Sequence, residues 1–184
     1  MKIEDIYQKL TEAEKAFLAE LIEKDPLTRA SNLRKFEHDL TAEVERVNRE
    51  GRYASLLKVD IDGFKQVNDT RGYEEGNRVL MGVVNCLIGK LRPYNREVYR
   101  LSGGADEFAV LVPNTTLEQG GLVAERLRAS IEKSDLEVTV SVGVANYIGS
   151  CDTREDLVKY ADEALQQAKK AGKNQVRSWE RERE

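Results

Sequence analysis

The sequence is poor in the residue types that build several common kinds of site. Its 184 residues include one histidine, two cysteines and one tryptophan. The single histidine, His38, argues against a zinc site built on histidine, and Cys86 and Cys151 do not have the spacing of metal ligands. Two isolated cysteines also favour a reducing compartment, so we expect a cytoplasmic location.

An excess of positive charge and a long apolar run are lacking as well. Lysine and arginine number 29 against 33 acidic residues, a formal net charge of −4, which argues against a protein that mainly coats nucleic acid. The longest apolar run, VLMGVVNCLIG at 79–89, is about half of a membrane span. We therefore expect a soluble chain without a signal peptide and with no nucleic-acid or membrane partner. Whether it is part of a larger, membrane-bound sensor stays open.

Apolar residues recur with helix and strand periods along most of the chain, and their 40% share is enough for one core. Helices are expected at 32–50, 64–70, 74–91, 116–133 and 153–171, and strands at 53–61, 96–101, 106–112, 137–147 and 174–179. The third of these strands follows the second through a glycine turn, which indicates a hairpin. This order predicts an α/β (α+β) fold in which helices flank a mixed central sheet. The nearly continuous apolar run at 53–61 predicts a central strand.

Residues 3–24 are expected to be helical, because apolar residues recur there at spacings of three and four. Thr11 and Glu14 form a capping-box pattern, so a second helix can begin near Glu12. The segment either packs on its own domain or forms a stalk that dimerises and transmits a signal. We divide the chain into this N-terminal segment at 1–24, a domain at 25–178 and a charged tail at 179–184.

Carboxylates stand at the ends of two expected strands. Asp60 and Asp62 close the strand at 53–61, and Asp106 and Glu107 open the second strand of the hairpin. If these strands are neighbours, one carboxylate of the hairpin faces Asp60, and Mg²⁺ would relieve their repulsion while accepting phosphate oxygens. This arrangement suits metal-assisted phosphoryl or nucleotidyl transfer. The alternative is an ordinary polar hairpin beside a solvated strand end.

Two further features are compatible with phosphate binding. Gly103 and Gly104 in the hairpin turn allow a backbone to approach a ligand closely. Lys169 and Lys173 lie four residues apart, on one face of a helix, where they can hold phosphates. Alternatively, the two lysines only offset the dipole at the helix C-terminus.

Taken together and in this order, the motifs resemble the GGDEF domain family, the catalytic module of diguanylate cyclases, from residue 25 to residue 176. The resemblance is carried by DPLT at 25–28, DIDGFKQVNDTRG at 60–72, SGGADEF at 102–108, TVSVGVA at 139–145 and ADEALQQAKKAGKN at 161–174. It implies a fold similar to the palm of nucleotidyl cyclases and polymerases. It also implies that a homodimer condenses two GTP molecules to cyclic di-GMP with Mg²⁺ or Mn²⁺.

The resemblance also implies roles for residues at the matching positions. The metal set is Asp60, Ile61, Asp106 and Glu107, of which the three acidic residues are catalytic. Glu107 is either a second acidic group at the metal ions or a base for the attacking 3′-hydroxyl. The substrate-binding set comprises a backbone turn, two base-reading amides, the signature glycines and two phosphate-binding lysines: Phe64, Lys65, Asn68, Asn77, Gly103, Gly104, Lys169 and Lys173.

The chain departs from the family pattern at several positions. Two extra residues lie between Arg100 and Asp106, so the turn beside the nucleotide is longer. Arg29 replaces a glycine, and Tyr73 replaces a histidine. Asn77 replaces an aspartate that reads guanine, and an amide offers one acceptor where a carboxylate accepts two donors.

Three alternatives follow from these departures. The chain is a cyclase selective for GTP, a cyclase that also accepts ATP and makes cyclic GMP-AMP, or an inactive nucleotide-binding signalling module. An upstream sensor domain is a further expected partner. The family's inhibitory R-x-x-D site is not matched at residues 92–96, so we expect weak or absent product inhibition through it.

Overall fold

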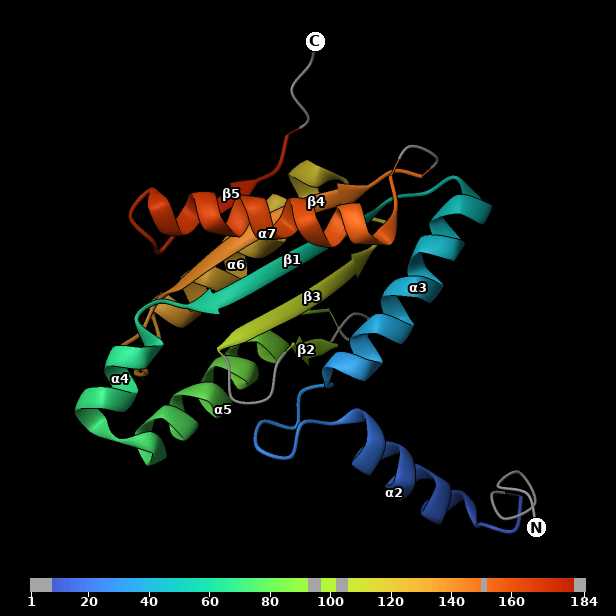
Figure 1. The fold of residues 1–184 in the computed structure, drawn as a ribbon, viewed down its shortest axis with the longest axis horizontal. Coiled ribbons are helices and arrows are strands. Elements are labelled where there is room, and N and C mark those ends of the chain that lie inside the picture. The colour runs from blue at the N-terminus through green and yellow to red at the C-terminus, as the bar shows by residue number, and fades with distance from the viewer. Residues whose placement is uncertain (1–7, 93–96, 102–105, 150–151, 181–184) are drawn as a thin grey trace.

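Five strands form one mixed sheet at the centre of the molecule (Figure 1). The computed structural model describes residues 8–92, 97–101, 106–149 and 152–180. The strands are β1 (Ala54–Ile61), β2 (Val98–Arg100), β3 (Glu107–Pro113), β4 (Val140–Tyr147) and β5 (Val176–Ser178). Their order is β2-β3-β1-β4-β5, with β4 and β5 parallel and the other neighbours antiparallel. The predicted mixed sheet, its central strand and the β2–β3 pairing are confirmed.

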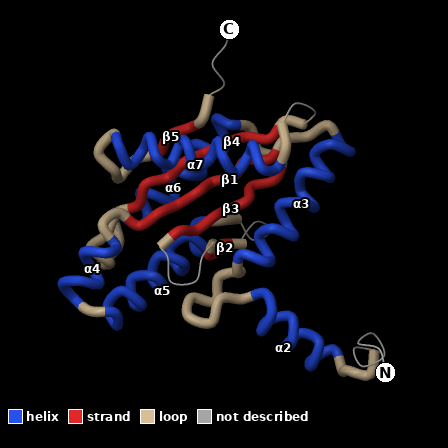
Figure 2. Tube along the Cα trace, in the orientation of Figure 1, coloured by secondary structure: helices blue, strands red, loops and turns tan. Residues whose placement is uncertain are grey.

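Helices cover both faces of this sheet (Figure 2). They are α2 (Glu12–Glu23), α3 (Leu33–Glu50), α4 (Phe64–Arg71), α5 (Tyr73–Lys90), α6 (Leu117–Glu132) and α7 (Arg154–Lys170). Side chains of α5 and α6 join one apolar cluster with the sheet, and those of α3 and α7 join a second cluster on the opposite face. Over the described residues, no helix is both long and apolar enough to cross a membrane.

The central strand β1 determines where charge enters this core. Alternate residues of a strand serve opposite faces of its sheet. Leu57, Val59 and Ile61 are buried against α5 and α6. On the other face, the apolar residue Leu56 is followed by Lys58 and Asp60, which are also buried. The α7 face of β1 therefore changes from apolar to charged toward the C-terminal end of the strand.

Helix α7 lies unusually close to β4 because of Gly143. A Cβ atom on Gly143 would lie 2.2 Å from the carbonyl oxygen of Ala161 and 2.3 Å from the backbone nitrogen of Leu165. Both contacts are with the backbone of α7, which cannot rotate away as a side chain would. The absence of a side chain at Gly143 therefore sets the distance between helix and sheet.

The N-terminal segment is not helical over all of the expected 3–24, of which residues 3–7 lie outside the described residues. Residues 8–11 are not helical, and α2 begins after Thr11, whose side chain accepts a hydrogen bond from the Glu14 N–H while Glu14 bonds back to the Thr11 N–H. The capping box thus fixes the start of α2 at Glu12. This agrees with the expectation that a second helix begins near this residue. No side chain of α2 is buried, and Phe17 and Leu21 are each 60% exposed. These exposed side chains are more typical of a stalk than of a helix packed on its own domain, and both expectations stay predictions.

A buried ion pair joins the start of the domain to β2. Asp25 accepts hydrogen bonds from the backbone N–H and hydroxyl of Thr28 and from the Arg100 guanidinium, the last at 3.0 Å. Burial opposes ionisation of Asp25, but these hydrogen bonds outweigh it and lower the pKa of the carboxyl. Arg29 follows with φ of 62°, a left-handed conformation that glycine adopts without strain. Glycine is the residue that the resembled family has at this position.

We predict opposite effects for two glycine-to-alanine substitutions. Gly143→Ala should lower the free energy of unfolding by about 3 kcal/mol, because the new methyl group overlaps the α7 backbone. Gly89→Ala is the matched control: it lies in α5, where an added Cβ meets nothing within 4 Å. The control should raise the free energy of unfolding by roughly 0.5–1 kcal/mol through helix propensity. Urea denaturation measures both, and equal effects of the two substitutions would contradict the close approach of α7.

Candidate active site

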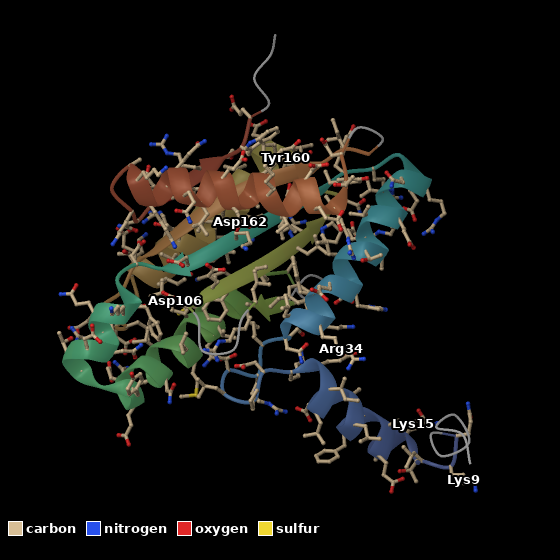
Figure 3. The ribbon with its side chains drawn as sticks, viewed as in Figure 1. Lys9, Lys15, Arg34, Asp106, Tyr160 and Asp162 are labelled. Atoms are coloured by element: carbon tan, nitrogen blue, oxygen red, sulfur yellow. The ribbon has the colours of Figure 1, made fainter. Side chains whose placement is uncertain are left out.

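Three carboxylates gather at the C-terminal end of β1. Asp60 lies directly opposite Glu107 of β3 in the strand register. The backbone N–H of Ile61 donates to the carbonyl oxygen of Asp106 at 3.3 Å. Figure 3 labels Asp106 beside the start of β3. The structure thus brings together the acidic residues that the sequence placed at two separate strand ends.

Asp60 is the buried member of these three carboxylates. It is only 6% exposed, and its Oδ2 lies 2.7 Å from Nζ of Lys169 on α7. Burial raises the pKa of Asp60 from its ordinary value of 3.8 to about 6; the hydrogen bond from Lys169 opposes this, and the charges of Asp106 and Glu107 add to it. A cation at this position would favour the ionised form.

A second lysine, Lys58, enters the site from β1 itself. Its side chain is 7% exposed, and Nζ lies 2.7 Å from Oδ1 of Asp162 and 3.9 Å from Oε2 of Glu107. Figure 3 labels Asp162 on α7, beside β1. Sequence reasoning missed Lys58; the available signal was a lysine between apolar residues of the strand, two positions before Asp60.

Asp62, the other carboxylate at the end of β1, has a different environment. It accepts hydrogen bonds from the hydroxyls of Thr139 and Ser141, at 2.7 and 2.6 Å, and from the backbone N–H of Asn174 at 2.9 Å. Lys173 and Asn174 both have positive φ, 62° and 43°. Asp62 therefore holds the irregular turn after α7 against the sheet, and with it the position of Lys173.

The two candidate base-reading amides lie on adjoining helices after β1. Gly63, with φ of 73°, precedes α4, and Phe64 at the start of that helix is buried. A Cβ on Gly76 of α5 would lie 1.9 Å from Oδ1 of Asn68 on α4, so these helices touch at that point. Asn68 is half-buried, and Asn77, the residue after Gly76, is exposed.

The remaining predicted residues are more peripheral. Lys65 and Lys173 are exposed, the first on α4 and the second in the turn after α7. Gly103 and Gly104 lie outside the described residues, as do 93–96, where the R-x-x-D site of the resembled family would lie.

The described carboxylates suit a cation that takes other ligands as well. Within residues 8–92, 97–101, 106–149 and 152–180, no group of three or more His, Cys, Asp or Glu side chains is arranged to hold a metal ion. Mg²⁺ commonly uses one or two protein carboxylates and completes its shell with water and phosphate oxygens. The Lys169 ammonium already shows that the Asp60 carboxylate accepts a cation. The donor set therefore fits Mg²⁺ or Mn²⁺ arriving together with a phosphate.

Comparison with known proteins agrees with this geometry. A sequence model of the family described as "Diguanylate cyclase, GGDEF domain" matches residues 22–175. Response regulator PleD of Caulobacter vibrioides is 36% identical over 166 residues, which are 85% of this chain and 36% of PleD. Diguanylate cyclase DosC of Escherichia coli is 32% identical over 163 residues, 84% of this chain and 35% of DosC. The chain spans about a third of the length of these curated relatives.

Solved structures are similar throughout the fold. Diguanylate cyclase SiaD of Pseudomonas aeruginosa, in complex with its activator SiaC, aligns with a TM-score of 0.82 and 36% identity over 96% of this chain and 69% of that chain. The GGDEF domain of PA1120 from the same organism aligns with a TM-score of 0.77 and 31% identity, covering 85% and 94% of the two chains. The coiled coil and GGDEF domain of DgcB from Caulobacter crescentus shares the fold, with a TM-score of 0.83 at 24% identity and 90% of both chains covered. The expected palm-like fold is confirmed.

The raised pKa of Asp60 predicts how stability depends on pH without divalent cations. The folded chain binds the Asp60 proton more tightly than the unfolded chain, since the folded pKa is about 6 and the ordinary value is 3.8. This contribution to stability is complete below about pH 4 and is lost as the pH rises through about 6. The loss should be on the order of 2–3 kcal/mol, relative to Asp60→Asn, which does not titrate.

Urea denaturation of the wild type and Asp60→Asn at intervals between pH 4 and pH 8 measures this difference. Glu118→Gln, which changes an exposed carboxylate on α6 and keeps Asp60, is the control and should follow the pH dependence of the wild type. A difference between wild type and Asp60→Asn that stays constant over this range would contradict the pKa assigned to Asp60.

Proposed function

Because this chain belongs to the GGDEF domain family of diguanylate cyclases, we propose that it is a cyclic dinucleotide synthase that condenses two GTP molecules to cyclic di-GMP in a homodimer. The observation that carries the proposal is the meeting of Asp60, Asp106 and Glu107 at the end of the central strand, opposite Lys169. In a metal–triphosphate complex, the acidic groups would bind the metal ion and the lysine would bind the phosphates.

The acidic residues would hold the metal and handle the attacking hydroxyl. Asp60 and Asp106, with the backbone at Ile61, would hold Mg²⁺ or Mn²⁺. With the ion bound, the site gains a Lewis acid that stabilises charge on the reacting phosphate. Glu107, whose side chain is 41% exposed, is open enough to accept the proton of a 3′-hydroxyl or to serve as another metal ligand.

Binding of the triphosphate would use the elements on either side of the carboxylates. The first N–H groups of a helix lack acceptors within the helix, so those of Phe64 and Lys65 at the start of α4 are available to phosphate oxygens. Lys169 and Lys173 would contact the β- and γ-phosphates, where their charge offsets that of the transition state. Gly103 and Gly104 would border the nucleotide.

Recognition of the base would fall to Asn68 and Asn77 on the adjoining helices α4 and α5. One amide oxygen at Asn77 accepts a single donor of guanine, and the amide N–H₂ adds a donor that adenine can use. Tolerance of ATP, with cyclic GMP-AMP as product, is therefore the alternative within the same reaction. An inactive nucleotide-binding module is the other alternative, and the longer turn between Arg100 and Asp106 is the feature that favours it.

Turnover needs two half-sites, so the proposal includes a homodimer. The division into an N-terminal segment at 1–24, a domain at 25–178 and a tail at 179–184 belongs to it as well. Helix α2, which exposes Phe17 and Leu21, is suited to a stalk that brings two domains together or links the domain to a sensor.

The first prediction from the proposed function concerns the product. Purified chain incubated with Mg²⁺ and GTP, ATP or both should form cyclic di-GMP from GTP alone, identified by mass spectrometry. Formation of a mixed product in the third incubation would assign the ATP-tolerant alternative. Nucleotide binding without any cyclic product at high protein concentration would assign the inactive module.

The second prediction concerns the carboxylates. Asp106→Ala should reduce product formation at least about 100-fold, because a ligand of the ion that stabilises the transition state is lost. Asp135→Ala, which removes an exposed carboxylate before β4, is the control and should keep the wild-type rate. Unfolding curves of both variants check that the fold persists. Wild-type turnover in Asp106→Ala would refute the metal role of this residue.

The third prediction concerns base selectivity. Asn77→Asp should increase the preference for GTP over ATP roughly tenfold, since a carboxylate accepts two guanine donors and repels none of them. The ratio of kcat/KM for the two nucleotides measures this preference. Asn85→Asp, on the same helix but away from α4, is the matched control. An unchanged ratio in Asn77→Asp would exclude a base-reading role.

A further inference from the structure

A buried lysine stands among the carboxylates of this site, and the family resemblance gives it no role. Lys58 lies two residues before Asp60 on β1, so both side chains leave the same face of the sheet. Its Nζ lies between Asp162 of α7, at 2.7 Å, and Glu107 of β3, at 3.9 Å. The shorter distance is a charge-assisted hydrogen bond, and the longer one is an electrostatic contact.

Packing explains why Lys58 is held in this place. Its partners in the register are Ala109 on β3 and Gly143 on β4, two residues with little or no side chain. Helix α7 covers this point closely because Gly143 has no Cβ. The lysine chain therefore runs through a narrow space beneath α7, and its charged end emerges beside Asp162, which is half-exposed.

Lys58 and Asp60 together make two ion pairs of opposite polarity between β1 and α7. Lys58 on the strand pairs with Asp162 on the helix, whereas Asp60 on the strand pairs with Lys169 on the helix, both at 2.7 Å. Asp162 and Lys169 are seven residues apart and thus on the same side of α7, about two turns from each other. The helix is attached to the strand at two points.

We propose that Lys58 is a positioning residue of this site: its ammonium group ties Glu107 to Asp162 of α7 and weakens the attraction of the carboxylates for a free divalent cation. The inference rests on the proposed function, because it concerns how that site takes up its metal. Metal and triphosphate would engage Asp60 and Lys169 separately, which opens their ion pair. The bond between Lys58 and Asp162 then keeps α7 attached, so that Lys169 stays in reach of the phosphates.

If the ion pair of Lys58 were purely structural, its removal would change metal affinity in the opposite direction. Loss of a structural pair loosens α7 and lowers both the metal affinity and the turnover of the site. Loss of a competing positive charge strengthens binding of a cation, even where turnover falls. The direction of the change in metal affinity therefore separates the two roles.

The test is a titration of Mn²⁺ into nucleotide-free protein, with free Mn²⁺ measured by electron paramagnetic resonance. Lys58→Met keeps the length of the side chain but removes its charge, and it should bind Mn²⁺ roughly three- to tenfold more tightly than the wild type. Lys58→Arg retains the charge and should restore the wild-type affinity. Asp162→Asn leaves Glu107 as the nearer carboxylate for Lys58 and should weaken Mn²⁺ binding.

Lys159→Met, which removes an exposed lysine of α7, is the control for general loss of charge and should leave Mn²⁺ affinity unchanged. If the wild type shows no binding in the range used, appearance of binding in Lys58→Met is the expected result. Unchanged or weaker binding in Lys58→Met than in the wild type overturns the proposal. Thermal unfolding of each variant shows whether the fold is retained.

Activity provides a second and separate measurement. Lys58→Met should lower kcat for cyclic di-GMP formation about tenfold with a smaller change in KM, since α7 and Glu107 lose a fixed attachment. Lys58→Arg should recover most of this loss. Absence of product from the wild type would refute the proposed function, whereas the Mn²⁺ titration would still decide the role of Lys58. Normal kcat in Lys58→Met, with wild-type product present, would overturn the positioning role alone.

Discussion

At the end of β1 the carboxylate of Asp60 is buried within electrostatic reach of Asp106 and Glu107. An ionised group in such a place is costly unless positive charge compensates it. Two lysines do so from different directions: Lys169 reaches Asp60 from α7, and Lys58 lies beside Glu107 from within the sheet. This charge balance involves the position of α7 for both lysines. Lys169 is part of this helix, and Lys58 holds the helix in place through its ion pair with Asp162.

The position of α7 in turn depends on residues that carry no charge. Gly143 lets the helix backbone approach β4, and Asp62 holds the turn that follows the helix through three hydrogen bonds. The same close approach confines the side chain of Lys58. Packing and electrostatics are therefore coupled at this point: a methyl group added to Gly143 would displace the helix that bears both Asp162 and Lys169.

Much of this arrangement could be predicted from sequence. Apolar periodicity gave the helices and strands of the domain to within a few residues, and the capping box of Thr11 and Glu14 marked the start of α2. The meeting of Asp60 with the hairpin carboxylates followed from their places at strand ends. The roles of Lys58 and Asp62 could not be predicted, because each depends on partners far along the chain that only the strand register and the docking of α7 bring close.

The charge balance also bears on what the site can bind. Asp60 and Lys169 neutralise each other, so a free cation must displace a lysine, and a free triphosphate must displace a carboxylate. A complex of a divalent cation with a nucleoside triphosphate would supply both partners at once, the cation for Asp60 and the phosphates for Lys169. In the role proposed for Lys58, its positive charge would disfavour the cation alone without hindering an anionic complex. Under the proposed function, the site would therefore prefer the metal–nucleotide complex over either component.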